Sequence, residues 1–350
     1  MSVTLRPLAA TDSLQELTAL LHKAYAALGA QGWNFTAVDQ SVELTAKRVA
    51  GGGCLVAVDE GGRLVGTVNM RGPYRPGQDA WSLATPWYLR DDTAILSQFA
   101  VDPDCQGQGL GTQLMGAAEA WAAQRGYLHV ALDTAEPAEP LQRRYAQRGY
   151  RTVGRTQWEG KSYASVLMAK ALPHSPLRAA LLRLAHYELW ATRRLLKAVD
   201  GLSDAQYRQD AGLFFKSVHG TLNHLLVGQS LLWLPRFAEG GSPVMALNAE
   251  AEPDRARLRQ RLLDGAARWP AVIAALDETR LCEGVLDYRT AQGEPASVLM
   301  AACLQHVFNH GTHHRGQISA ALTALGQTCP ELDLMHMLRE WPQPKDTRTS

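Results

Sequence analysis

The stretch VDPDCQGQGLGTQL, residues 101–114, joins a run typical of a β-strand to a run typical of a helix. Glycines stand at positions 107, 109 and 111, so the backbone can turn freely and its N–H groups can converge on one point. The N-terminus of the following helix adds a partial positive charge there. The turn therefore predicts a site for a pyrophosphate group that needs no lysine. A dinucleotide-binding fingerprint needs wider glycine spacing and a βαβ context, and this stretch has neither.

Around this turn, residues 1–170 alternate short β-type runs with helical patterns, which predicts an α+β domain. A helix is expected over residues 110–124, with Gly126 as its stop signal. The first two expected strands flank an Asp-Glu-Gly-Gly turn and form a hairpin. The expected strands are GCLVAVDE (53–60), RLVGTVNM (63–70), AILSQFAV (94–101), LHVALDT (128–134) and a hairpin-like pair within VGRTQWEGKSYASVLMAK (153–170).

From about Pro176 the pattern changes to long amphipathic helices, which predict an all-α four-helix bundle. Pro270 is expected to kink or split the third helix. The expected domains are 1–170 and 179–345, joined by the linker ALPHSPLR at 171–178. The four helical stretches are PLRAALLRLAHYELWATRRLLKAVDGL, FKSVHGTLNHLLVGQSLLWLPRFAEG, EPDRARLRQRLLDGAARWPAVIAAL and ASVLMAACLQHVFNHGTHHRGQISAALTALG.

The bulk properties narrow the function classes. The chain has 350 residues, too many for one ordinary core, and 46% of them are hydrophobic. A formal net charge of +1 gives no electrostatic reason to bind nucleic acid or an anionic membrane. Five cysteines without a CxxC pair favour reduced thiols, and neither a signal sequence nor a membrane-length apolar run is seen. We therefore expect a cytoplasmic protein.

A family resemblance adds to the interpretation of the glycine turn. Gln106-x-x-Gly109-x-Gly111, after a strand that ends in Ala-Val-Asp-Pro, resembles the acyl-CoA-binding motif of GCN5-related N-acetyltransferases (GNAT), as does the downstream RRYAQRGYRTVG (143–154). The resemblance implies a mixed sheet that opens between its fourth and fifth strands, with acetyl-CoA in the gap and a small-molecule amine as acceptor. The implied cofactor-binding residues are Phe99, Ala100, Val101, Gln106, Gly107, Gln108, Gly109, Leu110, Gly111 and Thr112.

The same resemblance implies chemical roles. The amine attacks the thioester as a neutral base, a backbone N–H at Phe99–Val101 stabilises the oxyanion, and Tyr145 is the implied general acid. The alternative for Tyr145 is a half-buried aromatic on an amphipathic helix. The family often has an asparagine before this helix, where the chain has TAEPAEPL, and a carboxylate at the position of Gln98. The general base therefore stays open: a water chain or an acceptor that is already neutral would suffice.

The connection at 71–92 is long for two neighbouring strands and carries the aromatic residues Tyr74, Trp81, Trp87 and Tyr88. Aromatic side chains on a loop predict either acceptor binding and contact with the other domain, or a small core of their own. The stretch GWNFT (32–36) lies where the acceptor-side loop of the family usually falls, and the same alternatives apply to it.

Four histidines crowd into HVFNHGTHHRGQ, residues 306–317. On a helix, spacing alone permits the pairs 306/310, 310/314 and 310/313, and two imidazoles four residues apart can bind one metal ion. A third ligand must come from another helix, on which His219 and His224 stand about 140° apart, so that only one of them can face the interior. For a lone histidine an ordinary core or surface role is the better explanation; four together favour a metal site.

The stretches SVHGTLNHLLVGQSLLWLPRF, HVFNHGTHHRGQI and ELDLMHMLRE resemble those of the DinB-like metal-binding four-helix bundles over residues 176–342. The resemblance implies the ligands His224, His310 and His314, with His306 and His313 beside the site or facing solvent. Gln229 stands where an acid is common. Three neutral imidazoles leave an open position on a metal ion, as in catalytic zinc sites, and both Zn²⁺ and Ni²⁺ suit them. The family includes transferases of low-molecular-weight thiols.

We therefore expect an acetyl-CoA-dependent N-acetyltransferase of a small amine, fused to a metal-dependent thiol S-transferase or hydrolase, with a role in bacterial detoxification or stress response. A low-molecular-weight thiol is a second expected partner. In the alternative, the bundle is a non-catalytic metal-binding or dimerisation module, which would make the protein a homodimer. Binding of DNA is disfavoured because the chain has no basic stripe.

Overall fold

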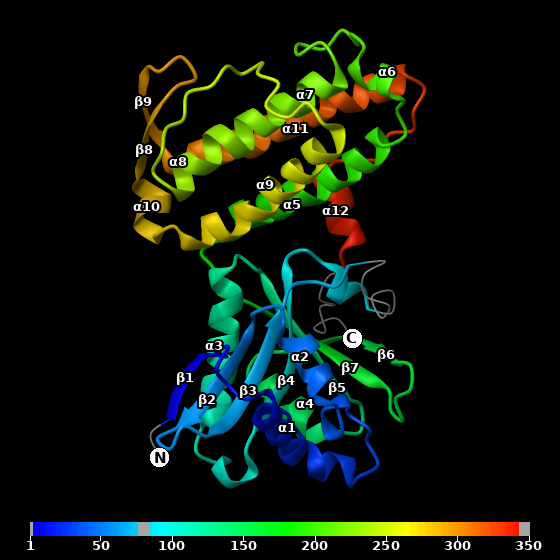
Figure 1. The fold of residues 1–350 in the computed structure, drawn as a ribbon, viewed down its shortest axis with the longest axis vertical. Coiled ribbons are helices and arrows are strands. Elements are labelled where there is room, and N and C mark those ends of the chain that lie inside the picture. Colours follow the sequence, from blue (N-terminus) through cyan, green and yellow to red (C-terminus); the bar gives the residue numbers. More distant parts are fainter. Residues whose placement is uncertain (1–2, 76–84, 343–350) are drawn as a thin grey trace, which may run out of the picture. The chain divides into compact units, whose positions relative to one another are not determined.

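The computed structural model describes residues 3–75 and 85–342. The chain divides into two compact units (Figure 1). Among the described residues, the first unit extends to Pro173 and includes Trp341 and Pro342, and the second is His174–Glu340. The predicted linker 171–178 overlaps the end of the last strand of the first unit and the start of helix α5 (Pro176–Val199), which Ser175 caps through its side chain.

The first unit is built on one mixed sheet of seven strands in the order β1-β2-β3-β4-β5-β7-β6. Neighbouring strands are antiparallel except for β4 and β5, which are parallel. This confirms the predicted α+β class and the hairpin β2–β3. The strands are β1 (Val3–Pro7), β2 (Cys54–Asp59), β3 (Leu64–Arg71), β4 (Thr93–Val101), β5 (His129–Ala135), β6 (Arg151–Thr156) and β7 (Ser165–Ala171).

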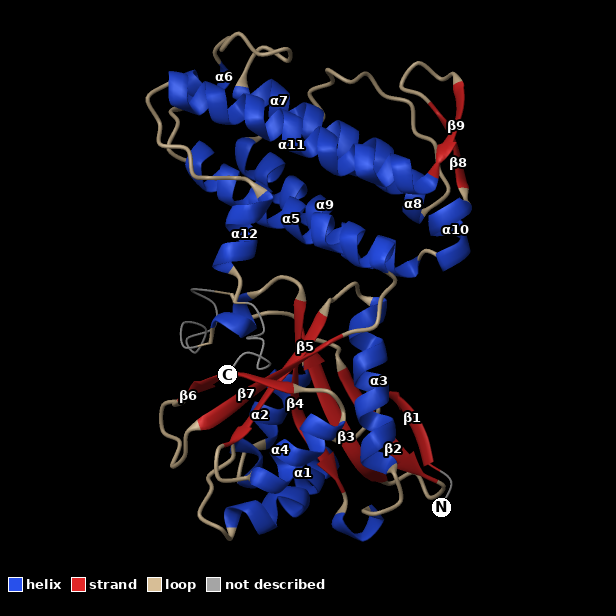
Figure 2. Ribbon diagram, turned by 180° about the vertical axis from the view of Figure 1, so that it is seen from behind, coloured by secondary structure: helices blue, strands red, loops and turns tan. Residues whose placement is uncertain are grey.

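The alternation of side chains along β2 shows that helices cover both faces of the sheet. Leu55 and Ala57 join a core cluster with helix α3 (Leu110–Gln124), whereas Cys54 and Val56 pack with helix α1 (Leu14–Gly29) on the other face. Helices α2 (Val42–Val49) and α4 (Glu139–Gln147) and three short turns, η1 (Thr36–Val38), η3 (Pro86–Leu89) and η4 (Pro103–Cys105), complete the unit (Figure 2).

The sheet opens between β4 and β5. Their pairing extends over three positions only, from Thr93 opposite His129 to Ile95 opposite Ala131. Beyond Ile95 each strand continues beside its other neighbour, β3 or β7. Backbone groups of β4 that would face β5 therefore have no ladder partner there, and they line a gap in the sheet. The splayed sheet expected from the resemblance is present.

The second unit is helical, and its four long helical segments form the bundle that the sequence predicts. One core cluster draws leucines from all four of them, for instance Leu195, Leu222, Leu258 and Leu322. The segments are α5 (Pro176–Val199), α7 (Val218–Leu225) continued by η5 (Leu226–Trp233) and α8 (Leu234–Ala238), α9 (Arg255–Ala275), and α11 (Met300–Ala324).

Two expectations about the bundle helices are corrected. Helix α9 is not split at Pro270, because Trp269 and Ile273 on either side are fully buried and hold the helix in the core. Residues 296–299 do not begin the last long helix; they form strand β9 (Pro295–Leu299), which pairs with β8 (Val285–Arg289). The short helices α6 (Asp204–Arg208), α10 (Glu278–Glu283) and α12 (Leu334–Glu340) were not predicted. No helix among the described residues is long and apolar enough to cross a bilayer.

Candidate functional site

The glycine turn between β4 and α3 is open toward a cavity. Gly107 and Gly109 have φ angles of 77° and 80°, the left-handed region that side chains with a Cβ disfavour. A Cβ built on either residue would meet no other group within 4 Å, so space lies in front of the turn. Gly109 is the N-cap of α3, whose first N–H groups have no partner within the helix. Space, free donors and the helix dipole fit a pyrophosphate group.

A β-bulge changes the direction of β4 just before this turn. Ala100 is opposite Thr67 and Ser97 is opposite Asn69, which leaves two residues of β4, Gln98 and Phe99, opposite one residue of β3. Gln98 has a φ of 49°, and the carbonyl of Phe99 accepts a hydrogen bond from the Tyr25 hydroxyl instead of joining a ladder. The sequence gives no local sign of this bulge, because Gln98 stands in an ordinary strand pattern.

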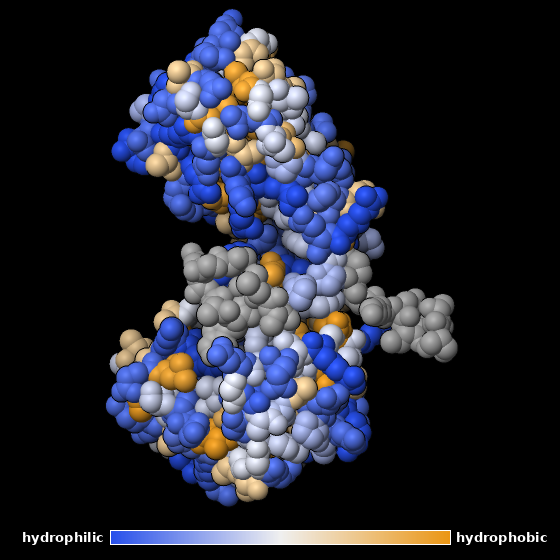
Figure 3. Space-filling model, turned by 90° about the vertical axis from the view of Figure 1, so that its right-hand side faces the viewer, coloured by the Kyte–Doolittle hydropathy of each residue, from blue (hydrophilic) through white to orange (hydrophobic). Residues whose placement is uncertain are grey.

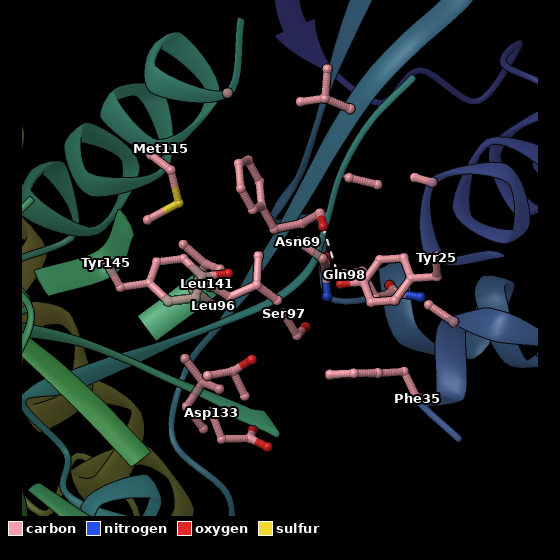
Figure 4. A pocket seen from close by; sticks show the side chains of 18 of the residues that line it. Tyr25, Phe35, Asn69, Leu96, Ser97, Gln98, Met115, Asp133, Leu141 and Tyr145 are labelled. Atoms are coloured by element: carbon pink, nitrogen blue, oxygen red, sulfur yellow. Dashed lines mark hydrogen bonds between the residues drawn. The ribbon is translucent and has the colours of Figure 1, made fainter. Parts of the chain in front are cut away.

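The gap between β4 and β5 belongs to a cavity of about 1340 Å³. Figure 4 shows Met115 of α3 and Tyr145 of α4 entering it from one side, and Tyr25 of α1 and Phe35 from the other. Every predicted cofactor-binding residue lines this cavity except Gln108, whose side chain is exposed between the two left-handed glycines. The cavity has room for both an extended thioester arm and a small acceptor.

Tyr145 lies half-buried on α4, with its ring against the edge of Tyr150 at a centroid distance of 6.0 Å. Within the described chain no group forms a hydrogen bond with its hydroxyl, which lines the cavity. Burial, helped by the charge of Asp133 and by Tyr25, raises the pKa of Tyr145 well above the ordinary value, so the hydroxyl keeps its proton at neutral pH. The side chain is therefore available as a proton donor.

Asp133 is a site residue that the sequence analysis missed. It lies on β5, where the strand has left β4, and its carboxylate accepts hydrogen bonds from the Tyr88 hydroxyl at 2.8 Å and the Trp158 indole at 2.9 Å. It is the only acidic side chain among the described residues that line the cavity. The signal in the sequence is weak: a single aspartate at the end of the apolar run LHVALDT.

The aromatic residues of the long connection divide between the two roles expected of them. Trp87 and Tyr88 are almost fully buried and pack with Ile95 in a small core of their own. Tyr74 and Tyr88 also line the cavity, so the core and the cavity share one wall. In the stretch 32–36, Phe35 lines the cavity and packs against Tyr163. Trp81 lies outside the described residues.

In the second unit, His224 of α7 meets His310 and His314 of α11. Their candidate ligand atoms all lie within 4.8 Å of one another, and the Nε2 atoms of His224 and His310 are 3.0 Å apart. Burial lowers the pKa of all three imidazoles. Neighbouring imidazoles add to the effect on two of them, so that the pKa falls to about 3 for His310 and about 4 for His314. They are therefore neutral at pH 7, which is the form that binds metal ions.

Hydrogen bonds at the far ring nitrogens orient two of these histidines. Nδ1 of His224 lies 2.8 Å from the carbonyl of Leu247, and Nδ1 of His314 lies 2.8 Å from Oε1 of Gln317. Each oxygen can only accept, so each Nδ1 carries the proton and each Nε2 offers a lone pair to the cluster. Phe215 stacks on the His224 ring at a centroid distance of 3.8 Å. Three preoriented neutral donors fit a divalent ion such as Zn²⁺ or Ni²⁺.

The remaining histidines lie outside the cluster. His306 and His313 are exposed. Both His219 and His224 are buried, but only His224 belongs to the cluster. His219 turns away from the cluster and pairs with Glu250 at 2.6 Å, from a segment between helices that covers it. Rotation about the helix axis alone does not predict that such a segment buries His219.

The position of Gln229 shows how tightly α11 packs beside the cluster. Its amide donates to the carbonyl of Val307, and a Cβ on Gly311 would lie 2.4 Å from that amide and 2.6 Å from Glu188. Glu188 forms a fully buried ion pair with Arg315. Gln229 lies in η5, which is π-helical, a rare backbone form that is frequent at functional sites.

Comparison with known proteins finds a family match within each unit. Residues 15–150 match the model of the acetyltransferase (GNAT) family, and residues 176–346 match that of the DinB family. The first match includes the glycine turn and Tyr145, and the second includes all three clustered histidines.

Two curated relatives from Bacillus subtilis (strain 168) match the chain. S-(2-succino)cysteine N-acetyltransferase is 29% identical over 170 residues, which are 48% of this chain and 95% of the relative. Protein DinB is 25% identical over 154 residues, 43% of this chain and 89% of the relative. Among solved structures, the ribosomal-protein-S18-alanine N-acetyltransferase from Escherichia coli superposes on 50% of this chain and 96% of its own, with 18% identity and a TM-score of 0.37.

Proposed function

The chain joins a GNAT-family acetyltransferase domain to a DinB-family domain, and from this premise we propose that it transfers the acetyl group of acetyl-CoA to the amino group of a small molecule. The cavity between β4 and β5 supports this proposal because one opening holds both the glycine turn and an untethered tyrosine hydroxyl. The name of the Bacillus relative, an N-acetyltransferase of a cysteine derivative, supports a small-molecule acceptor.

The residues of the cofactor side have distinct tasks in this proposal. Acetyl-CoA supplies an activated acetyl thioester. The turn Gln106–Thr112 binds its pyrophosphate through backbone N–H groups, and unpaired N–H groups of β4 near Phe99 stabilise negative charge on the carbonyl oxygen. Tyr145 gives its proton to the leaving sulfur, a task that its raised pKa permits at neutral pH.

Asp133 fills the role for which the sequence offered no residue. An amine attacks only after losing the proton of its ammonium form, and an ionised carboxylate can both attract the ammonium group and accept that proton. The Tyr88 and Trp158 hydrogen bonds hold Asp133 in one orientation and still leave lone pairs of each oxygen free. We assign to Asp133 the reception of this proton, either directly or through one water molecule.

The observation that carries this function is the meeting of the turn and Tyr145 at one cavity. It is tested by measuring acetyl-CoA binding by calorimetry and release of free thiol in the presence of primary amines. We expect binding, and thiol release that requires both Tyr145 and an amine. A protein that does not bind acetyl-CoA would contradict the proposal.

For the second domain we propose a metal-dependent transferase or hydrolase activity on small molecules, with a low-molecular-weight thiol as one substrate. A divalent ion held by His224, His310 and His314 would lower the pKa of a bound water or thiol. Across the part of the chain that is described, no fourth histidine, cysteine or acid joins the cluster, which supports a catalytic site with an open position. Detoxification would link the two activities.

The alternative function of the bundle is a metal staple or a dimerisation module. A dimer interface of this kind is usually rich in apolar surface. On the face shown in Figure 3, hydrophobic residues form only small groups among hydrophilic ones, which does not favour a broad interface there. Elemental analysis with thermal unfolding separates the cases. If the metal is structural, the bundle should unfold when the metal is removed; if it is catalytic, the fold should stay intact without it.

A further inference from the structure

The charges around the cavity are strongly unequal. Against the single carboxylate of Asp133, its described lining includes cationic residues from several elements. Arg148, the residue that follows α4, lies on the side of the glycine turn, where it donates to the carbonyl of Thr112. The phosphates of acetyl-CoA account for cations at this end. They do not account for cations on the α1–α2 side of the sheet.

Cations of that second group come from two segments of the chain. Lys47 and Arg48 occupy the last turn of α2, and Lys161 lies between β6 and β7, more than 100 residues later in the chain. Burial lowers the pKa of Lys161, and the charge of Arg48 lowers it further, so the two cations repel each other across this part of the cavity. Such an arrangement costs free energy unless a negative charge lies between them.

No carboxylate of the described protein pairs with these cations. Asp39 and Asp133 attract Lys161 without forming an ion pair with it, and neither Lys47 nor Arg48 forms one with any described residue. The guanidinium of Arg48 has five N–H donors, and none of them makes a hydrogen bond within the described chain. The guanidinium of Arg48 therefore offers free N–H donors at a half-buried position, which suits the binding of a carboxylate.

Lys161 makes structural hydrogen bonds that use only some of its N–H donors. Its ammonium group donates to the carbonyl of Asn34 at 2.6 Å and to the hydroxyl of Thr36 at 2.9 Å, and so fixes the segment that carries Phe35. An ammonium group has three donors, so one remains for a ligand. The same lysine thus connects the shape of the acceptor-side segment to the charge of the cavity.

We infer that the acceptor is an anionic primary amine, in which the amino group lies at Asp133 and one or more carboxylates lie between Arg48 and Lys161. This inference rests on the proposed acetyltransferase function and names its substrate class: an amino acid with at least one carboxylate beyond the α-carboxylate. The opposite charges at the two ends of the acceptor then match those of the cavity wall. A neutral or cationic amine would bring no negative charge to Arg48 and Lys161.

The first experiment compares amines with the full-length protein, by thiol release. Glutamate and glutamine form a matched pair, since an amide replaces one carboxylate. S-(2-succino)cysteine extends the series, norleucinamide has no carboxylate, and O-phosphoserine tests phosphate as the anionic group. We expect kcat/KM to be about tenfold or more higher for the amines with the extra anionic group, the usual size of one charged hydrogen bond.

The outcomes separate this inference from the function on which it rests. If no amine is acetylated, the acetyltransferase proposal fails. If glutamine and norleucinamide are acetylated as well as glutamate and S-(2-succino)cysteine, the function stands and the anionic acceptor is wrong. A preference for O-phosphoserine over the carboxylates would support an anionic acceptor and assign the anion as phosphate.

The second experiment locates the specificity. Arg48→Gln should raise KM for the anionic amines about tenfold and leave that for norleucinamide and acetyl-CoA unchanged, and Arg48→Lys should restore part of the loss. Arg143→Gln makes the same change on an exposed arginine outside the cavity and should change nothing. Equal KM increases for anionic and neutral amines in Arg48→Gln would overturn the assignment, as would an effect on acetyl-CoA alone.

Discussion

The two candidate sites of this chain are built in opposite ways. The cavity of the first unit is wide and takes its residues from both faces of a sheet, from α1 and α2 on one side and from α3 and α4 on the other. The histidine cluster of the second unit is compact and needs only two helices, α7 and α11. A cavity of this kind can lose one residue and keep its shape, whereas a three-ligand cluster has no spare member. The two sites should therefore respond differently to single substitutions.

The strongest test of this contrast is His310→Ala. The ring centroids of the three ligands lie 4.4–4.9 Å from one another, so each contributes equally to the cluster, and removal of His310 should reduce the bound metal from about one ion per chain to none. Metal content is measured by elemental analysis of the purified protein, with circular dichroism to verify the helices. His313→Ala removes an exposed neighbouring imidazole and should keep the metal. Metal that remains in His310→Ala would place the site elsewhere. Acetyl-CoA affinity should not change in either variant.

Tyr145→Phe should have the largest effect in the other unit. Loss of a general acid typically costs about 10²–10⁴-fold in rate, and we expect kcat to fall accordingly while KM for acetyl-CoA stays the same. Because the pKa of Tyr145 is raised, its proton is retained at higher pH than that of a free tyrosine, so the wild-type rate should show no loss from this group up to pH 10. An alkaline decline below pH 10 that vanishes in Tyr145→Phe would contradict this. Tyr288→Phe, on strand β8 of the second unit, is the control.

Asp133→Asn should act through the acceptor. The amide keeps an oxygen for Tyr88 but cannot take a proton, so kcat/KM should fall about 10²-fold at pH 7. The deficit should shrink as pH rises toward 10, because a growing fraction of the amine is then already neutral. Initial rates from pH 6 to 10 provide the measurement. A loss that is the same at every pH would assign Asp133 a merely structural role.

The same contrast decides how much could be predicted from the sequence. His310 and His314 are four residues apart on one helix, so local periodicity alone brings them together. The glycine turn is equally local, since Gly107 and Gly109 adopt the left-handed conformations that their residue type permits. Which histidine of the other helix completes the cluster needed the family resemblance as well, because helical rotation alone did not show that a separate segment buries His219.

What could not be predicted comes from contacts between distant segments. Asp133 becomes a site residue only because β5 leaves β4 after three paired positions, and the register of two strands is not a local property. Lys161 reaches the cavity through hydrogen bonds to Asn34 and Thr36, across more than 120 positions of sequence. The charge composition does not predict the role of Lys161 either, because a net charge of +1 does not show where cations are in local excess.

Gln317→Ala tests the hydrogen bond that orients His314 in the histidine cluster. Gln317 accepts the Nδ1 proton of His314, and removal of such a partner typically weakens metal binding about 10–100-fold. Competition with a chelator of known affinity measures the change, and Gln260→Ala, on the exposed face of α9, is the control. The metal should be held more weakly but not lost, in contrast to His310→Ala. Unchanged affinity would show that His314 needs no orienting partner.

The smallest expected effect is that of Gly109→Ala, for which a second glycine of the same conformation serves as the control. Gly109 and Gly62 have φ angles of 80° and 82°, and a Cβ on either would meet nothing within 4 Å. Alanine in the left-handed region costs roughly 1–2 kcal/mol, so both variants should lose similar stability in denaturant unfolding. Only at Gly109, which lines the cavity, can relaxation of the turn move N–H groups away from a pyrophosphate, so only Gly109→Ala should also weaken acetyl-CoA binding, by about fivefold. Equal acetyl-CoA affinity in the two variants would mean that the turn does not bind the cofactor, however open the space in front of it.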